Sequence, residues 1–328
     1  MQFSSERRTV RRIGLGLAAL GRPGYITVGH GGDLPADRGI SAMEAHAHQV
    51  LDEAWTLGIR HFDAARSYGR AEDFLGSWLR AREIPPDAVV VSSKWGYTYT
   101  ANWRVDAEVH EVKDHSLAAL RRQIRESRER LGKYLDLYQI HSATLESGVL
   151  DDTAVLNELA HVRGSGTLVG LSVSGPRQAD TVRRALEVEC DGQRLFSAVQ
   201  ATWNLLERSA DAALLEAHRA GVRVIIKEAL ANGVLTERND DPAMAPLLAI
   251  LRAEAERLAT SVDAVALAAA LARPWADLVL SGAATTHQLR SNLRALACPW
   301  DDASETRLSR LASDPREYWA RRASRPWT

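Results

Sequence analysis

Hydrophobic residues fall into two patterns that alternate along almost the whole chain. Short apolar runs, rich in Val, Leu and Ile, are typical of buried strands. They span residues 14–17, 59–63, 89–93, 135–140, 169–173, 197–201, 222–226 and 278–280. Between them, apolar residues recur three and four positions apart, which predicts helices with one buried face. These helices span residues 43–57, 71–82, 115–131, 151–162, 176–188, 211–220, a paired region at 244–272, and 286–296.

The succession of strand and helix predicts a (β/α)8 TIM barrel, a parallel eight-stranded barrel with outer helices. Parallel strands covered by helices close into a filled barrel when there are eight of them. An open doubly wound sheet is the competing architecture, but no linker or change in composition divides the 328 residues. We therefore expect one barrel domain over residues 1–328, with an N-terminal extension at 1–10 and a C-terminal tail at 312–328.

Two segments lie outside the alternating pattern. Residues 21–39 are rich in Gly and Pro, which predicts a loop after the first strand. The tail contains several arginines together with Tyr318, Trp319 and Trp327. Such a tail either packs across the barrel or hangs free.

Composition narrows the class of protein. Apolar residues make up 45% and charged residues 25% of the chain, the balance of a globular protein. With 41 basic and 42 acidic residues the net charge is −1, so no strong field attracts nucleic acid. The apolar stretch at 262–272 is shorter than the ~20 residues of a membrane span, and the first residues lack the apolar core of a secretory signal. We expect a cytoplasmic protein that binds neither nucleic acid nor membrane, either a monomer or a homo-oligomer.

Ionisable side chains follow three consecutive predicted strands. Asp63 ends the second strand and Tyr68 lies in the loop after it, while Lys94 and His141 follow the third and fourth strands. Singly, Asp63 is explained as a turn cap, Tyr68 as a loop residue and His141 as a core histidine. Active sites of this fold form where the C-terminal ends of the strands meet. We therefore expect these four side chains to converge.

Their chemistry suits proton transfer to a carbonyl oxygen. The pKa of a free tyrosine is about 10, and a neighbouring ammonium lowers it, so we expect Lys94 to acidify Tyr68 while Asp63 compensates the lysine. His141 can donate a hydrogen bond to a substrate oxygen. Tyr68 is then a general acid for a carbonyl, or a general base for an alcohol. None of these groups is an electron source, so a redox reaction needs a hydride-carrying cofactor.

The chain resembles the aldo-keto reductases over roughly residues 10 to 298. The resemblance is carried by IGLG at 13–16, HFDAARSYG at 61–69, SSKWG at 92–96, YQIH at 138–141, VQATWN at 199–204, NGVL at 232–235 and SGAATTHQLRSN at 281–292. It implies a (β/α)8 barrel, a nicotinamide cofactor and a catalytic tetrad matched by Asp63, Tyr68, Lys94 and His141. The implied function is an NAD(P)H-dependent oxidoreductase that interconverts an aldehyde or ketone and its alcohol by direct hydride transfer.

The same resemblance implies which residues hold the cofactor. The matched positions are Gly16 and Leu17 for the nicotinamide ribose, Ser172 and Gln200 for the carboxamide, Leu230, Asn232 and Gly233 for the pyrophosphate, and Gly282, Ala283, Ala284, Gln288 and Asn292 for the adenosine. Many relatives that prefer NADP carry basic residues near positions 282 and 288, which this chain lacks, although Arg290 could substitute. The resemblance favours NADP, with NAD as the alternative.

The chain departs from the family pattern in two places. Val173 follows Ser172 where an Asn is frequent. After the seventh strand, the residues at 227–229 are Lys-Glu-Ala instead of an aromatic residue and Ser-Pro, so this segment does not supply the ring that stacks on the nicotinamide. Lys227 either approaches a phosphate or points to solvent, and Glu228 would repel a diphosphate.

Aromatic residues follow the third strand at Trp95, Tyr97, Tyr99 and Trp103. They form either a packed cluster or a wall for the substrate, and Trp95 and Tyr97 are the predicted substrate contacts. A small carbonyl or alcohol compound, apolar, aromatic or a sugar, would suit such a wall.

Two other functions compete with a reductase. A Schiff-base lyase would use Lys94 as its nucleophile, and a regulatory or redox-sensing subunit would bind the nicotinamide with little turnover. No metal site is predicted, because His46 and His48 are two positions apart on a helix and point to different faces.

Overall fold

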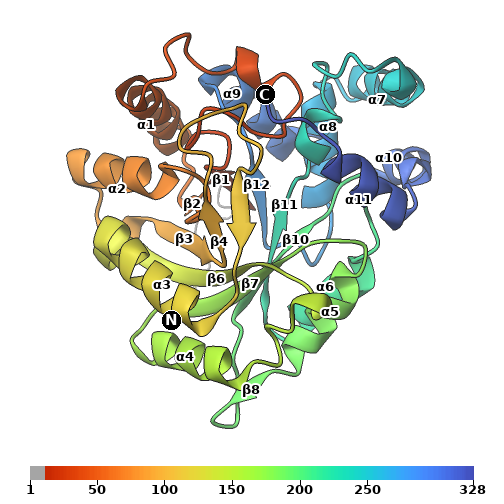
Figure 1. The fold of residues 1–328 in the computed structure, drawn as a ribbon. Helices are drawn as coiled ribbons and strands as arrows, with labels where there is room; N and C mark the ends of the chain where they lie inside the picture. Colours follow the sequence, from red (N-terminus) through yellow and green to blue (C-terminus); the bar gives the residue numbers. More distant parts are fainter. Residues whose placement is uncertain (1–11) are drawn as a thin grey trace.

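Eight parallel strands close into a barrel in this computed structural model, which describes residues 12–328 (Figure 1). The barrel strands are β1 (Ile13–Gly16), β2 (His61–Asp63), β3 (Val90–Trp95), β6 (Leu135–Ala143), β7 (Leu168–Val173), β10 (Ala198–Thr202), β11 (Arg223–Lys227) and β12 (Leu278–Ser281). Because β1 pairs with both β2 and β12, the sheet has no free edge. The predicted barrel is confirmed and the open sheet is ruled out. The extension expected at residues 1–10 lies outside the described residues.

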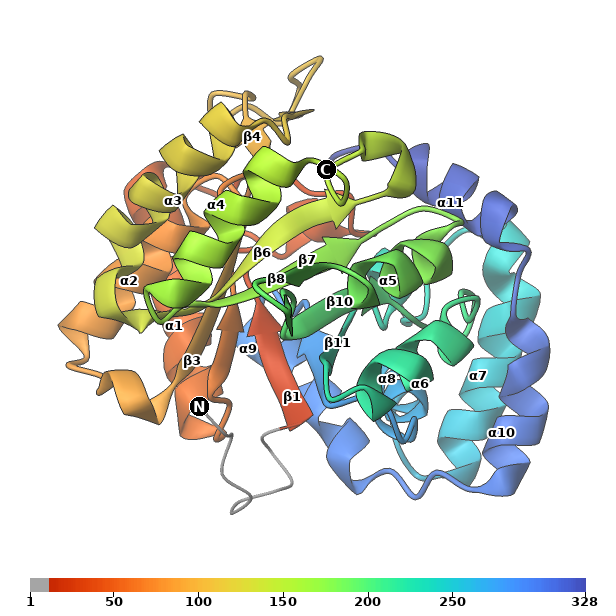
Figure 2. The same ribbon diagram turned by 90° about the horizontal axis from the view of Figure 1, so that it is seen from below.

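Helices pack around the outside of the barrel (Figures 1 and 2). They are α1 (Ile40–Thr56), α2 (Ala71–Ala81), α3 (Leu117–Leu131), α4 (Thr153–Gly164), α5 (Gln178–Leu186), α6 (Asp211–Arg219), α7 (Ala245–Arg257), α8 (Val262–Leu271), α9 (Thr286–Leu293) and α10 (Asp302–Leu308). A further helix, α11 (Pro315–Ala323), belongs to the C-terminal tail and lies at the C-terminal ends of the strands. Side-chain caps begin several of them, and the hydroxyl of Ser116 accepts from the Ala119 N–H before α3. Every residue of helix α8 except Asp263 is buried, which explains why its sequence is apolar on nearly all faces.

The inside of the barrel has an apolar layer and a polar layer. Successive side chains of a strand point to opposite faces, so every second residue points inward. The inward-pointing side chains in the lower part of the barrel are apolar and form one cluster, made of Leu137, Ala198, Ile225, Leu278 and Leu280. Two residues further along β6 and β10 they are Gln139 and Gln200, both buried. The apolar layer therefore forms a floor beneath a set of polar side chains at the C-terminal rim.

Additional elements surround this rim. A hairpin of β4 (Tyr97–Tyr99) and β5 (Glu111–Lys113) follows β3 at this rim. A second hairpin, of β8 (Glu189–Cys190) and β9 (Gln193–Arg194), precedes β10 and therefore lies at the opposite end of the barrel. The 21–39 segment is the predicted loop and contains one short turn of 3-10 helix, His30–Gly32. No helix among residues 12–328 combines the length and hydrophobicity needed to cross a membrane.

The C-terminal tail crosses the barrel mouth and meets the loop after β1 (Figure 1). Thr328 and Tyr25 exchange two backbone hydrogen bonds, each of 3.1 Å. The Trp327 ring stacks on His110 of the hairpin loop, with ring centres 3.9 Å apart. Of the two arrangements expected for the tail, the packed one is therefore observed.

Candidate active site

Asp63 and Lys94 form a buried ion pair at the rim. The Lys94 ammonium donates to the Asp63 carboxylate and, at 3.0 Å, to the backbone carbonyl of Ala64. Their side chains are 3% and 0% exposed, so each charge depends on the other for its compensation. The two residues end neighbouring parallel strands, as expected from the sequence.

Three further side chains hold the Asp63 carboxylate in place. Its Oδ1 atom accepts from the Ser92 hydroxyl at 2.7 Å and from the amide groups of Gln139 and Gln200 at 3.2 Å each. These donors come from β3, β6 and β10, so several strands fix one carboxylate. A buried carboxylate with this many partners has a fixed orientation. Gln200, which the resemblance assigns to the cofactor, also lines the adjoining cavity.

Tyr68 lies above this pair. Its ring centre is 5.0 Å from the Lys94 ammonium and 5.4 Å from the centre of the His141 ring. Among the described residues its hydroxyl has no hydrogen-bond partner, and the side chain lines the cavity. Burial, followed by the negative charge of Asp63, raises the pKa of Tyr68 well above 10.

This result corrects the electrostatic expectation for the phenol. Asp63 compensates the charge of Lys94 in their ion pair. Arg22 is the cation that opposes the rise in the pKa of Tyr68. Tyr68 is therefore protonated at neutral pH, so its hydroxyl carries the proton that a general acid would donate.

His141 stands beside the phenol as an uncharged imidazole. Its Nδ1 atom lies 3.3 Å from the Ser67 hydroxyl, while Nε2 makes no hydrogen bond within residues 12–328. Burial, followed by the charge of Lys94, lowers the pKa of His141 well below 6.5. A neutral imidazole can hydrogen-bond a substrate oxygen without adding a charge to the site.

A cavity of about 790 Å³ connects the tetrad to the start of α9. The predicted cofactor residues that line it are Gly16, Gln200, Leu230, Asn232, Gly233, Gly282, Ala283, Ala284, Gln288 and Asn292. Leu17 is completely buried in the outer core instead. The Ser172 hydroxyl is also outside the lining and accepts from the Ser142 N–H at 2.8 Å. Ser142, Ser174 and Gly175 line the cavity near that position.

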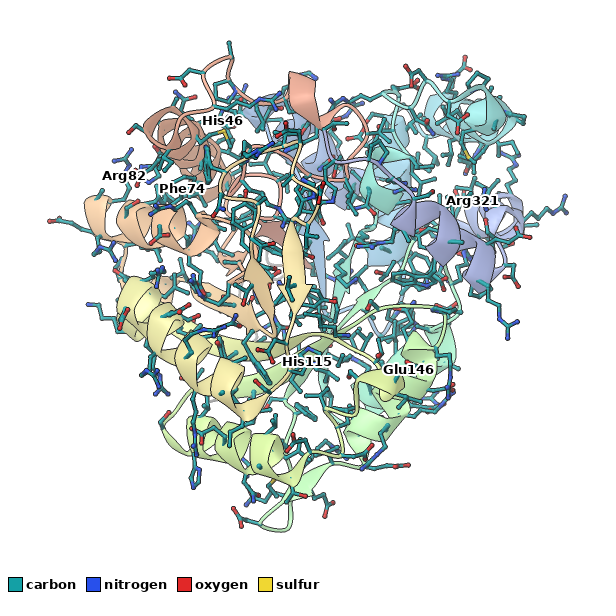
Figure 3. The ribbon with its side chains drawn as sticks, in the orientation of Figure 1. His46, Phe74, Arg82, His115, Glu146 and Arg321 are labelled. Atoms are coloured by element: carbon teal, nitrogen blue, oxygen red, sulfur yellow. The ribbon has the colours of Figure 1, made fainter. Side chains whose placement is uncertain are left out.

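The predicted substrate contacts separate into one residue that reaches the cavity and one that does not. Tyr97 lines the cavity, with its ring 5.0 Å from the His141 ring. Trp95 is completely buried, and its ring lies 5.6 Å from that of His115, which is labelled in Figure 3. Because Lys94 points into the barrel, the next residue must point outward. Trp95 therefore belongs to the core and is not a substrate contact.

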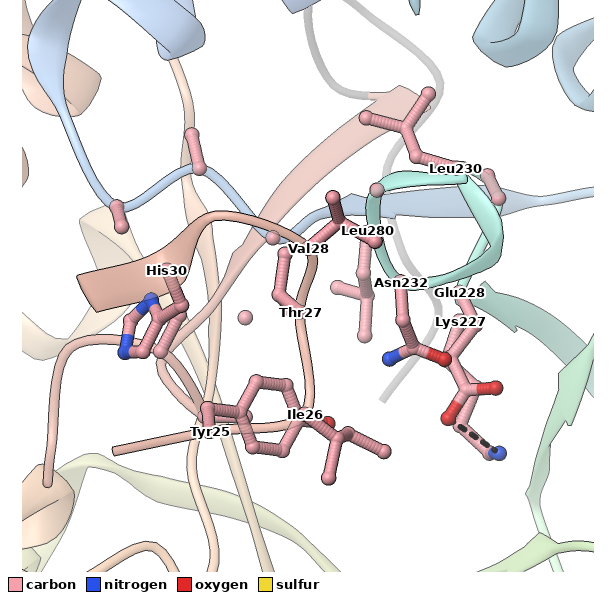
Figure 4. Close-up of a pocket in the computed structure, with 18 of the residues that line it drawn as sticks. Tyr25, Ile26, Thr27, Val28, His30, Lys227, Glu228, Leu230, Asn232 and Leu280 are labelled. Atoms are coloured by element: carbon pink, nitrogen blue, oxygen red, sulfur yellow. Dashed lines mark ion pairs between the residues drawn. The ribbon is translucent and has the colours of Figure 1, made fainter. Parts of the chain in front are cut away.

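Several lining residues were not predicted from the sequence. They come from the loop after β1 and from the tail, and comprise Arg22, Tyr25, His30, Trp319, Arg322 and Trp327. Lys227 and Glu228 at the end of β11, which the sequence analysis considered in relation to the cofactor phosphates, also line the cavity. Figure 4 shows Tyr25 and Ile26 of the loop across the cavity from Asn232 and Glu228. The loop and the tail have no periodic pattern, and only their composition marked them as unusual: Gly and Pro in the loop, and arginines and aromatic residues in the tail.

Lys227 and Glu228 belong to a charged network closed by the tail. Both carboxylate oxygens of Glu228 accept from the Arg322 guanidinium of α11, and Lys227 donates to the Thr202 hydroxyl at 2.7 Å. Burial lowers the pKa of Lys227 to about 8. Burial opposes ionisation of Glu228, but the charges of Arg322 and Lys227 outweigh it and lower its pKa to about 2. Lys227 lines the cavity and its side chain is 14% exposed, so it does not point to open solvent.

The far end of the cavity is bridged by Asp33. Its carboxylate accepts from the Gln288 amide of α9 at 2.8 Å and pairs with Arg238 of the loop after β11. The Gln288 carbonyl accepts from the Ala284 N–H at 2.8 Å. Arg290, considered above for a cofactor phosphate, pairs instead with Glu53 of α1 and does not line the cavity.

The cavity has features that fit a dinucleotide. It extends from the tetrad to the N-terminal end of α9, where backbone N–H groups favour anions. His30 lines it with both ring nitrogens buried and unpaired within the described residues. Burial, followed by the charge of Arg22, lowers the pKa of His30 to about 3, so the ring is neutral. No group of three or more potential metal ligands occurs among residues 12–328.

Fold and site together define a (β/α)8-barrel enzyme with a Tyr-His-Lys-Asp cluster at its rim. The family model described as "Aldo/keto reductase family" matches residues 12–312. The chain belongs to this family, as its motifs predicted, and is an oxidoreductase. The family typically binds a nicotinamide cofactor.

Named relatives are dehydrogenases and reductases. Pyridoxal 4-dehydrogenase of Microbacterium luteolum is 26% identical, covering 88% of this chain and 92% of its own. L-glyceraldehyde 3-phosphate reductase of Escherichia coli is 28% identical, with 89% and 87% covered. Among solved structures, an aldo-keto reductase of Bacillus halodurans in its holo form has a TM-score of 0.68 at 22% identity, covering 92% of each chain. This last likeness supports the fold.

Proposed function

We propose that this protein interconverts an aldehyde or ketone and its alcohol with NAD(P)(H), and that Tyr68 transfers the proton. The observation that carries the proposal is the placement of the Tyr68 hydroxyl, which is protonated, unpaired within the described residues and directed at a cavity shared with His141. A bound nicotinamide supplies or accepts the hydride. The protein groups bind the carbonyl compound and move the proton.

The proton step follows from the arrangement of the tetrad. A carbonyl oxygen between Tyr68 and the neutral His141 receives a hydrogen bond from each. As negative charge develops on this oxygen, Tyr68 donates its proton. Arg22, whose central carbon lies 5.2 Å from the Tyr68 ring centre, is the cation that opposes the rise in the pKa of the phenol and so favours the resulting phenolate. In the reverse direction the same phenolate accepts the alcohol proton.

The cofactor residues we propose are those of the predicted set that line the cavity. They are Gly16, Gln200, Leu230, Asn232, Gly233, Gly282, Ala283, Ala284, Gln288 and Asn292. NADP remains the proposed form because of the family resemblance, with NAD as the alternative, since Arg290 is engaged elsewhere. Separate titrations of tryptophan fluorescence with NADPH and NADH give the ratio of affinities that decides between them.

Lys94 argues against the Schiff-base alternative. An amine nucleophile must reach the substrate in its neutral form, whereas Lys94 is completely buried and ion-paired with Asp63. Borohydride trapping with a carbonyl substrate would detect a lysine adduct. The intact tetrad likewise favours turnover over a purely regulatory role.

Tyr68→Phe tests the proposal. We expect turnover of an uncharged aldehyde to fall by about 10²–10⁴-fold, because general acid catalysis is lost, while NADPH still binds. Tyr99→Phe is the matched control, since Tyr99 is also a tyrosine after a barrel strand but does not line the cavity. Turnover that is the same in Tyr68→Phe as in the unaltered protein would refute the assignment.

A further inference from the structure

Arg22 places a guanidinium group in the substrate end of the cavity. It belongs to the loop after β1, and 2% of its side chain is exposed. Its central carbon lies 5.2 Å from the Tyr68 ring centre, 4.7 Å from that of Tyr25 and 4.4 Å from that of Trp327. A strong cation therefore stands beside the proposed proton donor.

The protein satisfies only part of this guanidinium. Nη1 donates to the Ser67 carbonyl and to the Glu111 carboxylate, each at 3.0 Å. Within residues 12–328, neither Nε nor Nη2 of Arg22 donates a hydrogen bond to the protein, and Nε is enclosed. Nη2 keeps surface open to the cavity that Arg22 lines. One charged donor is thus left for a ligand.

The positive charge at this end is incompletely compensated. Glu111 is 27% exposed, so water weakens its attraction for Arg22. Nearby, Lys227 and Arg322 share the single carboxylate of Glu228. Among the described residues, Arg22 is therefore paired with a carboxylate that water partly screens, while Lys227 and Arg322 together carry one positive charge more than Glu228 balances.

We propose that Arg22 determines specificity by binding an anionic oxygen group, a carboxylate or a phosphate monoester, on the carbonyl substrate. The proposal rests on the proposed function and names its substrate class. The rings of Tyr25 and Trp327 shield the guanidinium from bulk water, which strengthens a charge-assisted hydrogen bond. An uncharged substrate leaves Nη2 without this partner.

Matched substrate pairs test the proposal. One arm compares kcat/KM for 4-carboxybenzaldehyde and benzaldehyde, and the other compares glycolaldehyde phosphate and glycolaldehyde. The unaltered protein should favour the anionic member in at least one arm, and that arm identifies the group. In Arg22→Met the anionic-to-neutral ratio of kcat/KM should fall by roughly 10- to 100-fold, as expected for loss of a hydrogen bond between charged groups. Arg22→Lys should retain part of the ratio.

Two further variants distinguish binding of the anionic group by Arg22 from a purely structural role of Arg22. Glu111→Gln removes the carboxylate that competes for Arg22, so the ratio should rise. Arg321→Met removes one positive charge from the exposed side of α11, where Arg321 is labelled in Figure 3, and should leave the ratio unchanged. If Arg22 only supports the fold, Arg22→Met lowers both members of a pair equally and the ratio stays constant, which overturns the proposal.

The outcome is distinguishable from failure of the proposed function. If the uncharged aldehydes are reduced but neither arm favours the anion, only the assignment of Arg22 is wrong. If no aldehyde is reduced, the proposed function fails. The anion site is then still tested by comparing the affinities for benzoate and for benzamide, each measured from the change in tryptophan fluorescence. Equal affinities for benzoate and benzamide, or no effect of Arg22→Met on benzoate affinity, would contradict the proposal.

Discussion

Glu228→Gln should destabilise the protein because it breaks the ion pair that fastens the tail. The Glu228 side chain is 8% exposed and Arg322 23%, so little water replaces the lost contact. The pKa of Glu228 is lowered from 4.5 to about 2 in the folded protein. A depression of that size corresponds to about 3 kcal/mol of folding free energy at pH 7.

The pH dependence of this loss has a defined sign. Because the folded pKa lies below the unfolded one, the carboxylate stabilises the fold fully above pH 4.5 and loses this effect as the pH falls towards 2. The difference between the unaltered protein and Glu228→Gln should therefore shrink from about 3 kcal/mol at pH 7 to about 2 kcal/mol at pH 3.5.

Urea unfolding at both pH values measures these differences. A cycle with Arg322→Met isolates the pair, and the double variant should lose much less than the sum of the two single variants. Glu216→Gln, which removes an exposed partner of Arg183, is the control and should change stability little. Losses that add in the double variant, or that are the same at pH 7 and pH 3.5, would show that the ion pair does not fasten the tail.

Two further predictions concern the surroundings of the tetrad. In Gly21→Ala the new Cβ would lie 2.2 Å from the Tyr68 carbonyl oxygen and 2.5 Å from the Ala71 Cβ. Thermal unfolding should therefore show a loss of about 1–3 kcal/mol in the free energy of unfolding, together with reduced turnover. Gly164→Ala is the control because nothing lies within 4 Å of its new Cβ, and equal behaviour of the two variants would contradict the prediction. Because the pKa of His141 lies well below 6.5, the pH profile of kcat/KM for an uncharged aldehyde should show no inflection near pH 6.5. An inflection at that pH which disappears in His141→Gln would show instead that the imidazole titrates there.

The strands and the tetrad were predictable because their signals are local. Each apolar run marks a strand, and the residue that ends it lies at the rim by the geometry of the fold. The same alternation shows why Trp95 was misplaced, since inward-pointing Lys94 requires its neighbour to point outward. Applying that period to each strand end would have removed Trp95 from the substrate contacts.

The charged partners were not predictable, because no local pattern records them. Arg22 and Glu111 are 89 residues apart in the chain, and Glu228 and Arg322 are 94 apart. Each pair joins two irregular segments that become neighbours only after the barrel closes. The expectation that Lys94 would acidify Tyr68 was wrong for a related reason, since the buried Asp63 adds a negative charge close to the phenol.

The strands hold the residues proposed for proton transfer, whereas irregular segments form much of the cavity wall, and this difference affects how the substrate selectivity of the protein can change. Asp63 is anchored by donors on three other strands, whereas the loop after β1 and the tail form much of the wall that faces the reactant. Exchanging residues in those two segments can redirect selectivity while leaving proton delivery intact. Libraries aimed at new reactants should therefore vary residues 22–39 and 312–328 together and keep Gly21, since the two segments hydrogen-bond to each other.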